Sequence, residues 1–244
     1  MLTSVRSLMA ATVLAGAALA TPAMAQDEGS SPISVSGNVA LVTDYRFRGV
    51  GLSDGDPAIQ GGITISTEPG FYVGAWGSSL GYTPAYGETE LDFSAGYATE
   101  VSGVGIDVGG TYYTYPSNDV GPSDVFEIYG KVSPSVGPLG LTFAAYYMPK
   151  QDSLGGDDNL YLSADASVGI PNTPVTLTGH IAYTDGGLAA FNSDSKAWDY
   201  SVGASITAFG GLTVGVAYIG VEDEGANING VTDDTVVGTL SFSF

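Results

Sequence analysis

The sequence contains no cysteine, and this absence excludes disulfide bonds and thiol chemistry. Basic residues are also scarce, because six Lys and Arg residues stand against 26 Asp and Glu residues. A nucleic acid is therefore not expected as a partner, since phosphate binding needs a basic surface. The acidic excess instead favours cations, either as counter-ions or as the species that is transported.

Long apolar runs are missing after the first 25 residues, so no helix of about 18 to 20 apolar residues is expected to span a membrane there. The first 25 residues have the pattern of a secretory signal peptide. Arg6 provides a positive start, a short apolar stretch follows, and Ala23-Met24-Ala25 is typical of a cleavage site. We expect a short periplasmic N-terminal segment over residues 26–33 and a membrane domain over residues 34–244.

The composition indicates strands and turns. Charged residues make up 13% of the chain against about 25% in an average domain, and there are 36 glycines and 15 tyrosines. If a chain without a spanning helix crosses a membrane, a closed β-barrel is the structure that satisfies its backbone groups in lipid.

Twelve segments of about ten residues with alternating hydrophobicity can be counted, a spacing typical of membrane barrels. They cover residues 34–48, 58–67, 71–81, 90–101, 104–115, 125–135, 139–148, 159–170, 175–184, 197–209, 212–220 and 235–244. Short turns such as Glu68-Pro69-Gly70 alternate with longer polar loops. We predict an all-β fold: a transmembrane, antiparallel up-and-down barrel with short periplasmic turns and longer extracellular loops.

Charged residues in the assigned strands lie opposite the larger apolar face, as expected if that face meets lipid. For residues 71–81 the sequence does not decide which of the two faces meets lipid. The apolar faces also provide an aromatic girdle at the extracellular end. Its predicted members are Tyr45, Phe47, Tyr112, Tyr147, Tyr183, Trp198, Tyr200 and Tyr218.

The opposite faces are predicted to line the lumen of the barrel. Their titratable residues are Asp44, Arg46, Arg48, Glu90, Asp92, Asp107, Glu127, Lys131, Asp165, His180 and Asp199. These groups either form an open, cation-favouring constriction or pair with one another and plug the bore. The number of strands does not decide between these two alternatives. About eight strands give a filled interior and about sixteen give an aqueous channel, and twelve lies between them.

The last strand, residues 235–244, alternates strictly and ends on Phe242 and Phe244. This pattern resembles the C-terminal strand of bacterial outer-membrane barrels. The resemblance implies that the two phenylalanines belong to the signal read by the barrel assembly machinery, and they also fit a lower aromatic girdle.

Three motifs near the N-terminus are similar to those of the proteobacterial Gcw family, also called TorF-type porins. They are Thr43-Asp44-Tyr45-Arg46-Phe47-Arg48-Gly49-Val50, the stretch from Asp54 to Gly62, and Gly70-Phe71-Tyr72-Val73-Gly74-Ala75-Trp76. Glu90-Leu91-Asp92 and Tyr112-Tyr113-Thr114-Tyr115-Pro116 are similar too. The resemblance implies an outer-membrane barrel with a transport role, and it supplies no substrate or catalytic residues.

Catalysis and cofactor binding are not expected. His180 is the only histidine, and its predicted place inside the barrel is wrong for a hydrolase acting at the surface. The acidic loops lack the full spacing of a calcium loop, so no metal site is predicted. The sequence predicts a passive channel in the cell outer membrane for small hydrophilic solutes, with a preference for cations. The alternative is a structural or adhesion barrel with a plugged lumen; lipid and lipopolysaccharide are expected partners of either.

Overall fold

A computed structural model describes residues 32–225 and 228–244 of the chain. The predicted signal peptide and residues 26–31 of the predicted periplasmic segment lie outside this part. In the described residues no helix is long and apolar enough to span a membrane.

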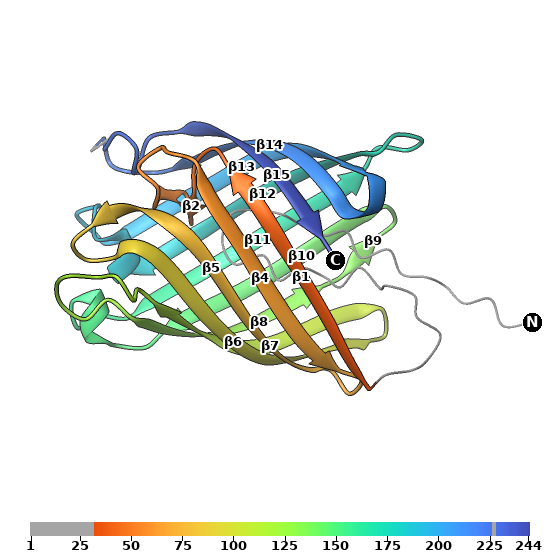
Figure 1. Ribbon diagram of the computed structural model, residues 1–244, viewed down its shortest axis with the longest axis horizontal. Helices are drawn as coiled ribbons and strands as arrows, with labels where there is room; N and C mark the ends of the chain where they lie inside the picture. The colour runs from red at the N-terminus through yellow and green to blue at the C-terminus, as the bar shows by residue number, and fades with distance from the viewer. Residues whose placement is uncertain (1–31, 226–227) are drawn as a thin grey trace, which may run out of the picture.

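Twelve long antiparallel strands form a closed barrel (Figure 1). They are β1 (Ile33–Val42), β4 (Ala58–Thr67), β5 (Phe71–Thr83), β6 (Gly87–Val101), β7 (Val104–Thr114), β8 (Val125–Ser133), β10 (Leu139–Met148), β11 (Asn159–Gly169), β12 (Val175–Gly186), β13 (Lys196–Ala208), β14 (Leu212–Val221) and β15 (Thr235–Ser243). Each pairs with its neighbours in chain order, and pairing of β15 with β1 closes the ring. The predicted fold class and strand number are confirmed.

Short elements complete the described fold. They are β2 (Arg46–Phe47), β3 (Val50–Gly51), β9 (Ser135–Val136) and the 3-10 turns η1 (Asp152–Leu154), η2 (Gly187–Ala189) and η3 (Phe209–Gly211). The turns after β4, β6, β8, β11 and β13 gather at one end of the barrel, which we call the short-turn end. The other connections gather at the long-loop end, on the left of Figure 1.

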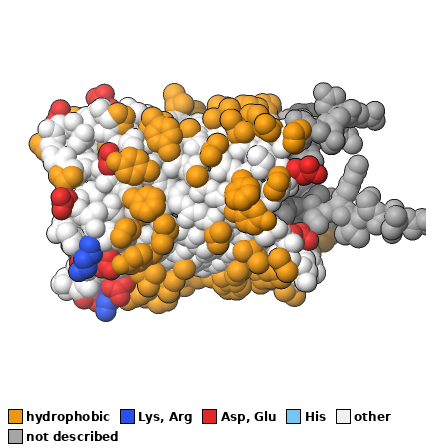
Figure 2. Space-filling model, turned by 90° about the horizontal axis from the view of Figure 1, so that it is seen from below, with side chains coloured by type: hydrophobic (Ala, Val, Ile, Leu, Met, Phe, Trp, Pro, Cys, Tyr) orange, Lys and Arg blue, Asp and Glu red, His pale blue; other side chains and the backbone are white. Residues whose placement is uncertain are grey.

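Alternate residues of each strand point away from the lumen, and most of these outward residues are apolar, so the outer wall is apolar. Hydrophobic side chains cover this wall in Figure 2, and charged side chains gather toward its two ends. Val35, Phe71 and Val202 are 58%, 61% and 63% exposed, values typical of residues that face lipid in a membrane barrel. The faces of β5 are now assigned: Phe71 and Val73 point outward, whereas Tyr72 is buried and Trp76 is partly buried.

The predicted first strand was too long. It was expected to cover residues 34–48 with Tyr45 and Phe47 facing lipid, but β1 ends at Val42 and Tyr45 is only 2% exposed. Beyond Thr43 the chain turns into the barrel and doubles back as β2 and β3, which pair with each other. We call residues 43–57 the inner hairpin. The connection over residues 84–86 is also shorter than predicted, because β5 and β6 extend to Thr83 and Gly87.

The other predicted girdle residues lie near the long-loop end. Tyr112, Tyr147, Trp198, Tyr200 and Tyr218 are exposed on the outer surface. The partly buried Tyr183 packs its ring against Trp198, with centroids 5.1 Å apart. Phe242 and Phe244 are exposed near the short-turn end, with centroids 6.4 Å apart.

Candidate functional site

A row of tyrosines crosses one side of the lumen wall. The strand register aligns, in order around the barrel, Tyr72, Gly96, Gly109, Tyr129, Tyr146 and Tyr161. The hydroxyls of Tyr72 and Tyr129 are hydrogen bonded to each other over the two glycines. A Cβ atom on Gly96 would lie 2.4 Å from the Tyr72 hydroxyl, so this crossing needs glycine beneath it.

The inner hairpin is anchored by Arg46, whose side chain is only 1% exposed. Its Nε donates to Asp44 Oδ2 at 2.6 Å, and Ser53 Oγ donates to the other oxygen of the same carboxylate at 3.0 Å. Its Nη1 donates to the carbonyl oxygens of Val231 and Asp233, at 3.1 and 2.9 Å, and its Nη2 lies 3.3 Å from Asp233 Oδ1. Charge-assisted bonds of this kind are about twice as strong as neutral ones, so Arg46 ties the hairpin to the segment before β15.

Arg48, at the tip of the hairpin, reaches a different part of the wall. Its guanidinium forms a salt bridge with Glu127 of β8, whose other oxygen accepts a hydrogen bond of 2.8 Å from the Tyr113 hydroxyl. The same guanidinium lies over the rings of Tyr161 and Tyr146, 4.1 and 5.4 Å from their centroids. Arg48 is therefore held by both charge and cation–π contact.

These two anchors show that the inner hairpin crosses the bore. Asp233 directly precedes β15, and Glu127 lies on β8, which is halfway around the ring from β15. Arg46 holds the first side and Arg48 the second. Phe47, between them, packs against apolar clusters on both sides, one around Tyr45 and one around Tyr113. The hairpin thus narrows the lumen on the long-loop side.

On the short-turn side of the hairpin, Lys131 and Asp107 form a further charged pair, with Nζ 3.7 Å from Oδ2. Lys131 Nζ also lies 4.4 Å from the centroid of the Tyr129 ring, and the Tyr72 hydroxyl donates to Asp107 at 2.7 Å. This pair therefore lies beside the tyrosine row.

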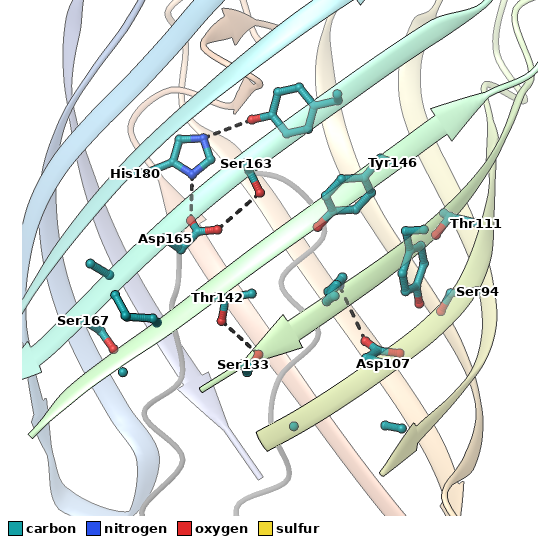
Figure 3. Close-up of a pocket in the computed structure, with 18 of the residues that line it drawn as sticks. Ser94, Asp107, Thr111, Ser133, Thr142, Tyr146, Ser163, Asp165, Ser167 and His180 are labelled. Atoms are coloured by element: carbon teal, nitrogen blue, oxygen red, sulfur yellow. Dashed lines mark hydrogen bonds and ion pairs between the residues drawn. The ribbon is translucent and has the colours of Figure 1, made fainter. Parts of the chain in front are cut away.

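His180 lies between two carboxylates. Its Nδ1 is 2.7 Å from Asp165 Oδ1, and its Nε2 is 3.0 Å from Asp199 Oδ1. The Tyr161 hydroxyl lies 3.0 Å from Nε2 and donates to Asp199 at 3.1 Å. Figure 3 shows His180 and Asp165 joined on the lumen wall, with Ser163 bonded to the same aspartate. Both ring nitrogens are thus engaged within the lumen network.

Glu90 and Asp92 differ from the other lumen carboxylates, because no salt bridge joins either to a basic side chain in the described part of the chain. Both are buried, with 1% and 4% exposure. The Tyr115 hydroxyl donates to Glu90 Oε1 at 3.2 Å, but Glu90 Oε2 and Asp92 Oδ1 have no hydrogen-bond partner.

Under the inner hairpin lies a cavity of about 1020 Å³. It extends from Arg46 and Arg48 to residues at the short-turn end, including Gly103 and Gly137. Ser94, Thr111, Thr142 and other polar side chains line it together with the charged pairs (Figure 3). Glycines and apolar residues such as Trp76 and Leu141 also contribute to the lining. The lumen therefore has an open part of mixed polarity toward the short-turn end and a packed part toward the long-loop end.

Eight of the eleven titratable residues predicted for the lumen border this cavity: Arg46, Arg48, Asp92, Asp107, Lys131, Asp165, His180 and Asp199. The other three, Asp44, Glu90 and Glu127, are buried and lie outside its lining. A role in permeation stays a prediction for all of them. The tyrosine row is not among the residues predicted from the sequence, although Tyr129 and Tyr161 alternate with the outward residues, which is the signal that places them inside.

The acidic loops engage the aromatic girdle. The Tyr147 hydroxyl donates to Asp158 at 2.8 Å, and this hydrogen bond lowers the pKa of the Asp158 carboxyl. Tyr112 donates to Asp124, and Tyr200 and Tyr218 donate to Asp234. Across residues 32–225 and 228–244, no group of three or more His, Cys, Asp or Glu side chains is arranged to hold a metal ion.

Comparison with solved structures shows the same fold in outer-membrane porins. The KdgM porin aligns with a TM-score of 0.57 and 11% identity, over 86% of this chain and 98% of that chain. The NanC porin aligns with a TM-score of 0.59 and 11% identity, over 86% and 99% of the two chains. At such low identity the likeness concerns the fold alone. Among curated proteins, none matches the sequence.

A family model described as a bacterial protein of unknown function, Gcw_chp, matches residues 26–244. The match covers the inner hairpin, all twelve strands and the N-terminal motifs that resemble this family. The chain therefore belongs to the Gcw_chp family of bacterial proteins.

Proposed function

We propose that this barrel is a narrow passive channel of the outer membrane for small hydrophilic solutes. The observation that carries the proposal is the cavity of about 1020 Å³, which is lined by polar and charged side chains inside a closed barrel with an apolar outer wall. A purely structural barrel is expected to have a lumen filled by side chains, so a cavity of this kind favours the channel. The long connections would face the outside of the cell and the short turns the periplasm, as in other outer-membrane barrels.

The pairing of the lumen charges supports the proposal that the channel prefers cations. Arg46, Arg48 and Lys131 each have a carboxylate partner, so none of them presents an unbalanced positive charge. Asp92 borders the cavity without a basic partner, and Asp165 and Asp199 share one histidine. Rings of carboxylates favour cations in channels, so the excess of acidic groups should repel anions.

The proposed partners are the lipid and lipopolysaccharide around the barrel, the solutes that pass through it, and the assembly machinery that would read Phe242 and Phe244. We do not propose an enzyme, since both nitrogens of His180 are bonded to carboxylates and neither is placed to act as a base for a nucleophile.

A second candidate function is a structural or adhesion barrel with a plugged lumen. The inner hairpin favours it, because it crosses the bore and joins apolar clusters on opposite sides. In a channel the same hairpin would form the constriction or would have to move.

Single-channel recording of the refolded mature protein in a planar bilayer separates the two functions. A channel gives discrete openings, and under a potassium chloride gradient its reversal potential should have the sign of a cation-selective pore. Folding is checked first by the shift in electrophoretic mobility on heating. Folded protein that never conducts would reject the channel and support the plugged barrel, and an anion-selective reversal potential would reject the proposed preference.

A further inference from the structure

Every basic side chain within the lumen already has a carboxylate partner. Arg46 is bonded to Asp44 and Asp233, Arg48 to Glu127, and Lys131 to Asp107. The remaining basic residues with described positions, Lys150 and Lys196, lie in or beside the connections at the long-loop end. Any further lumen carboxylate is therefore neutralised either by a proton or by a cation from solution.

Glu100 also borders the cavity without a salt bridge, but it is exposed near the short-turn end, whereas Asp92 is the buried carboxylate that borders the cavity without a basic partner. It is only 4% exposed, and its Oδ1 is buried without a hydrogen bond. Two positions away on the same face of β6, Glu90 also holds a buried oxygen, Oε2, without a partner. A buried ionised carboxylate without a partner is costly, and a second one nearby adds repulsion.

We propose that Asp92 is the binding point for a monovalent cation at the inner end of the cavity, below the inner hairpin. The cation would neutralise Asp92, reduce its repulsion with Glu90 and Glu127, and enter from the short-turn end through the polar cavity. This inference deepens the proposed function and rests on it, because it takes the cavity to be accessible to cations.

The chemistry favours a monovalent ion over a divalent metal. Divalent ions prefer several anionic or carbonyl oxygens, and no group of three such side chains suited to a metal is found in the described residues. Glu127, the third carboxylate nearby, is already engaged by Arg48 and by the Tyr113 hydroxyl. One carboxylate at a polar cavity suits a potassium ion or a small organic ammonium ion, which need a single negative charge.

The test uses the refolded full barrel in detergent and follows thermal unfolding, so it does not depend on conductance. Potassium replaces N-methyl-D-glucamine at constant ionic strength, because this larger cation is a poorer fit beside a buried carboxylate. A cation that binds only the folded state should raise Tm by about 3 to 5 °C for each tenfold increase in K⁺ above its Kd.

Asp92→Asn should remove this dependence on K⁺ and Asp92→Glu should retain it, since glutamate keeps the charge. Asp152→Asn, in the exposed turn η1, is the matched control that removes one carboxylate outside the lumen and should leave the dependence intact. A wild-type Tm that does not change with K⁺, or an Asp92→Asn barrel that still responds, would overturn the proposal. A barrel that never conducts but shows the Asp92-dependent response would reject the channel and leave the cation site standing.

Discussion

Glycine has a steric role in the lumen wall at two neighbouring positions. The rings of Tyr72 and Tyr129 approach each other from β5 and β8 across Gly96 and Gly109, which lie on the two strands between them. A Cβ atom on Gly109 would lie 2.7 Å from the Tyr129 hydroxyl and 2.7 Å from the carbonyl oxygen of Ala95. Glycine therefore lets large rings lie flat along the wall, where they support Asp107 and Lys131.

Gly96→Ala is expected to lower the free energy of unfolding by about 1 to 3 kcal/mol, the usual cost of overpacking. The added methyl group would meet the Tyr72 hydroxyl at 2.4 Å and the Val108 carbonyl oxygen at 2.7 Å. Urea unfolding of the refolded barrel, followed by tryptophan fluorescence, measures the change.

Gly179→Ala is the matched control. Gly179 lies inside β12, and a Cβ atom there would have nothing within 4 Å. Because alanine fits a strand better than glycine, this variant should be neutral or more stable by up to about 1 kcal/mol. Equal destabilisation by both substitutions would show that strand propensity, and not the crossing of the tyrosine rings, sets the effect.

Among the elements, the inner hairpin has the largest influence on the lumen. It is short, and its turn uses Arg48 and Gly49 with φ values of 52° and 80°. Because β2 and β3 share only two residue pairs, its stability depends on contacts with the barrel. Backbone hydrogen bonds join Gly51 to Val231 and Leu52 to Gly81, and side chains add further anchors. Arg46 and Arg48 supply the charged anchors, and Phe47 the apolar one. The size of the bore should therefore depend on two guanidinium groups.

The double variant Arg46→Ala/Arg48→Ala should raise the preference for cations and the single-channel conductance. It removes two of the three basic side chains of the lumen and, with them, the charged anchor of the hairpin on each wall. Truncating one partner of a buried ion pair costs about 3 to 5 kcal/mol, so unfolding in urea should also begin at a lower concentration.

The control is Lys150→Ala/Lys196→Ala, which removes the same charge at the long-loop end, from the connection after β10 and from the first residue of β13. It should change selectivity little, because those side chains lie outside the lumen. If the double arginine variant had the same cation selectivity as the wild-type protein, Arg46 and Arg48 would have no role in ion selection.

The inner hairpin also shows where sequence reasoning stops. Tyr45 and Phe47 continue the alternation of apolar and polar residues that begins in β1. A strand of the barrel wall and a hairpin inside the lumen can both show this period of two, so the pattern does not distinguish them. Only contacts between distant residues, such as Arg46 with Asp233, decide between the two. The pairing of lumen charges was unpredictable for the same reason, since it depends on which strands face each other across the bore.

At the scale of the whole molecule, sequence reasoning worked well. The predicted bounds of residues 58–67 and 139–148 coincide with β4 and β10, because lipid on one face and polar groups on the other impose strict alternation along each strand. Barrel closure involves the end of the chain: the backbone N–H and carbonyl of Phe244 bond to Gly37, each at 2.9 Å, and the Phe244 ring lies against that glycine.

Phe244→Ala tests whether this residue acts in assembly as well as in closure. Its side chain is 55% exposed on the outer wall, so its loss should cost the refolded barrel only about 1 kcal/mol. If the assembly machinery reads it, however, the amount of folded barrel in the outer-membrane fraction of cells should fall severalfold, as measured by heat-dependent mobility. Val236→Ala removes another exposed side chain from β15 and should leave that amount nearly unchanged. If both variants lowered the amount of folded barrel in cells equally, the effect of Phe244→Ala would be assigned to the stability of β15. An assembly signal at Phe244 instead predicts a defect in cells that only Phe244→Ala shows and that refolding in vitro does not reproduce.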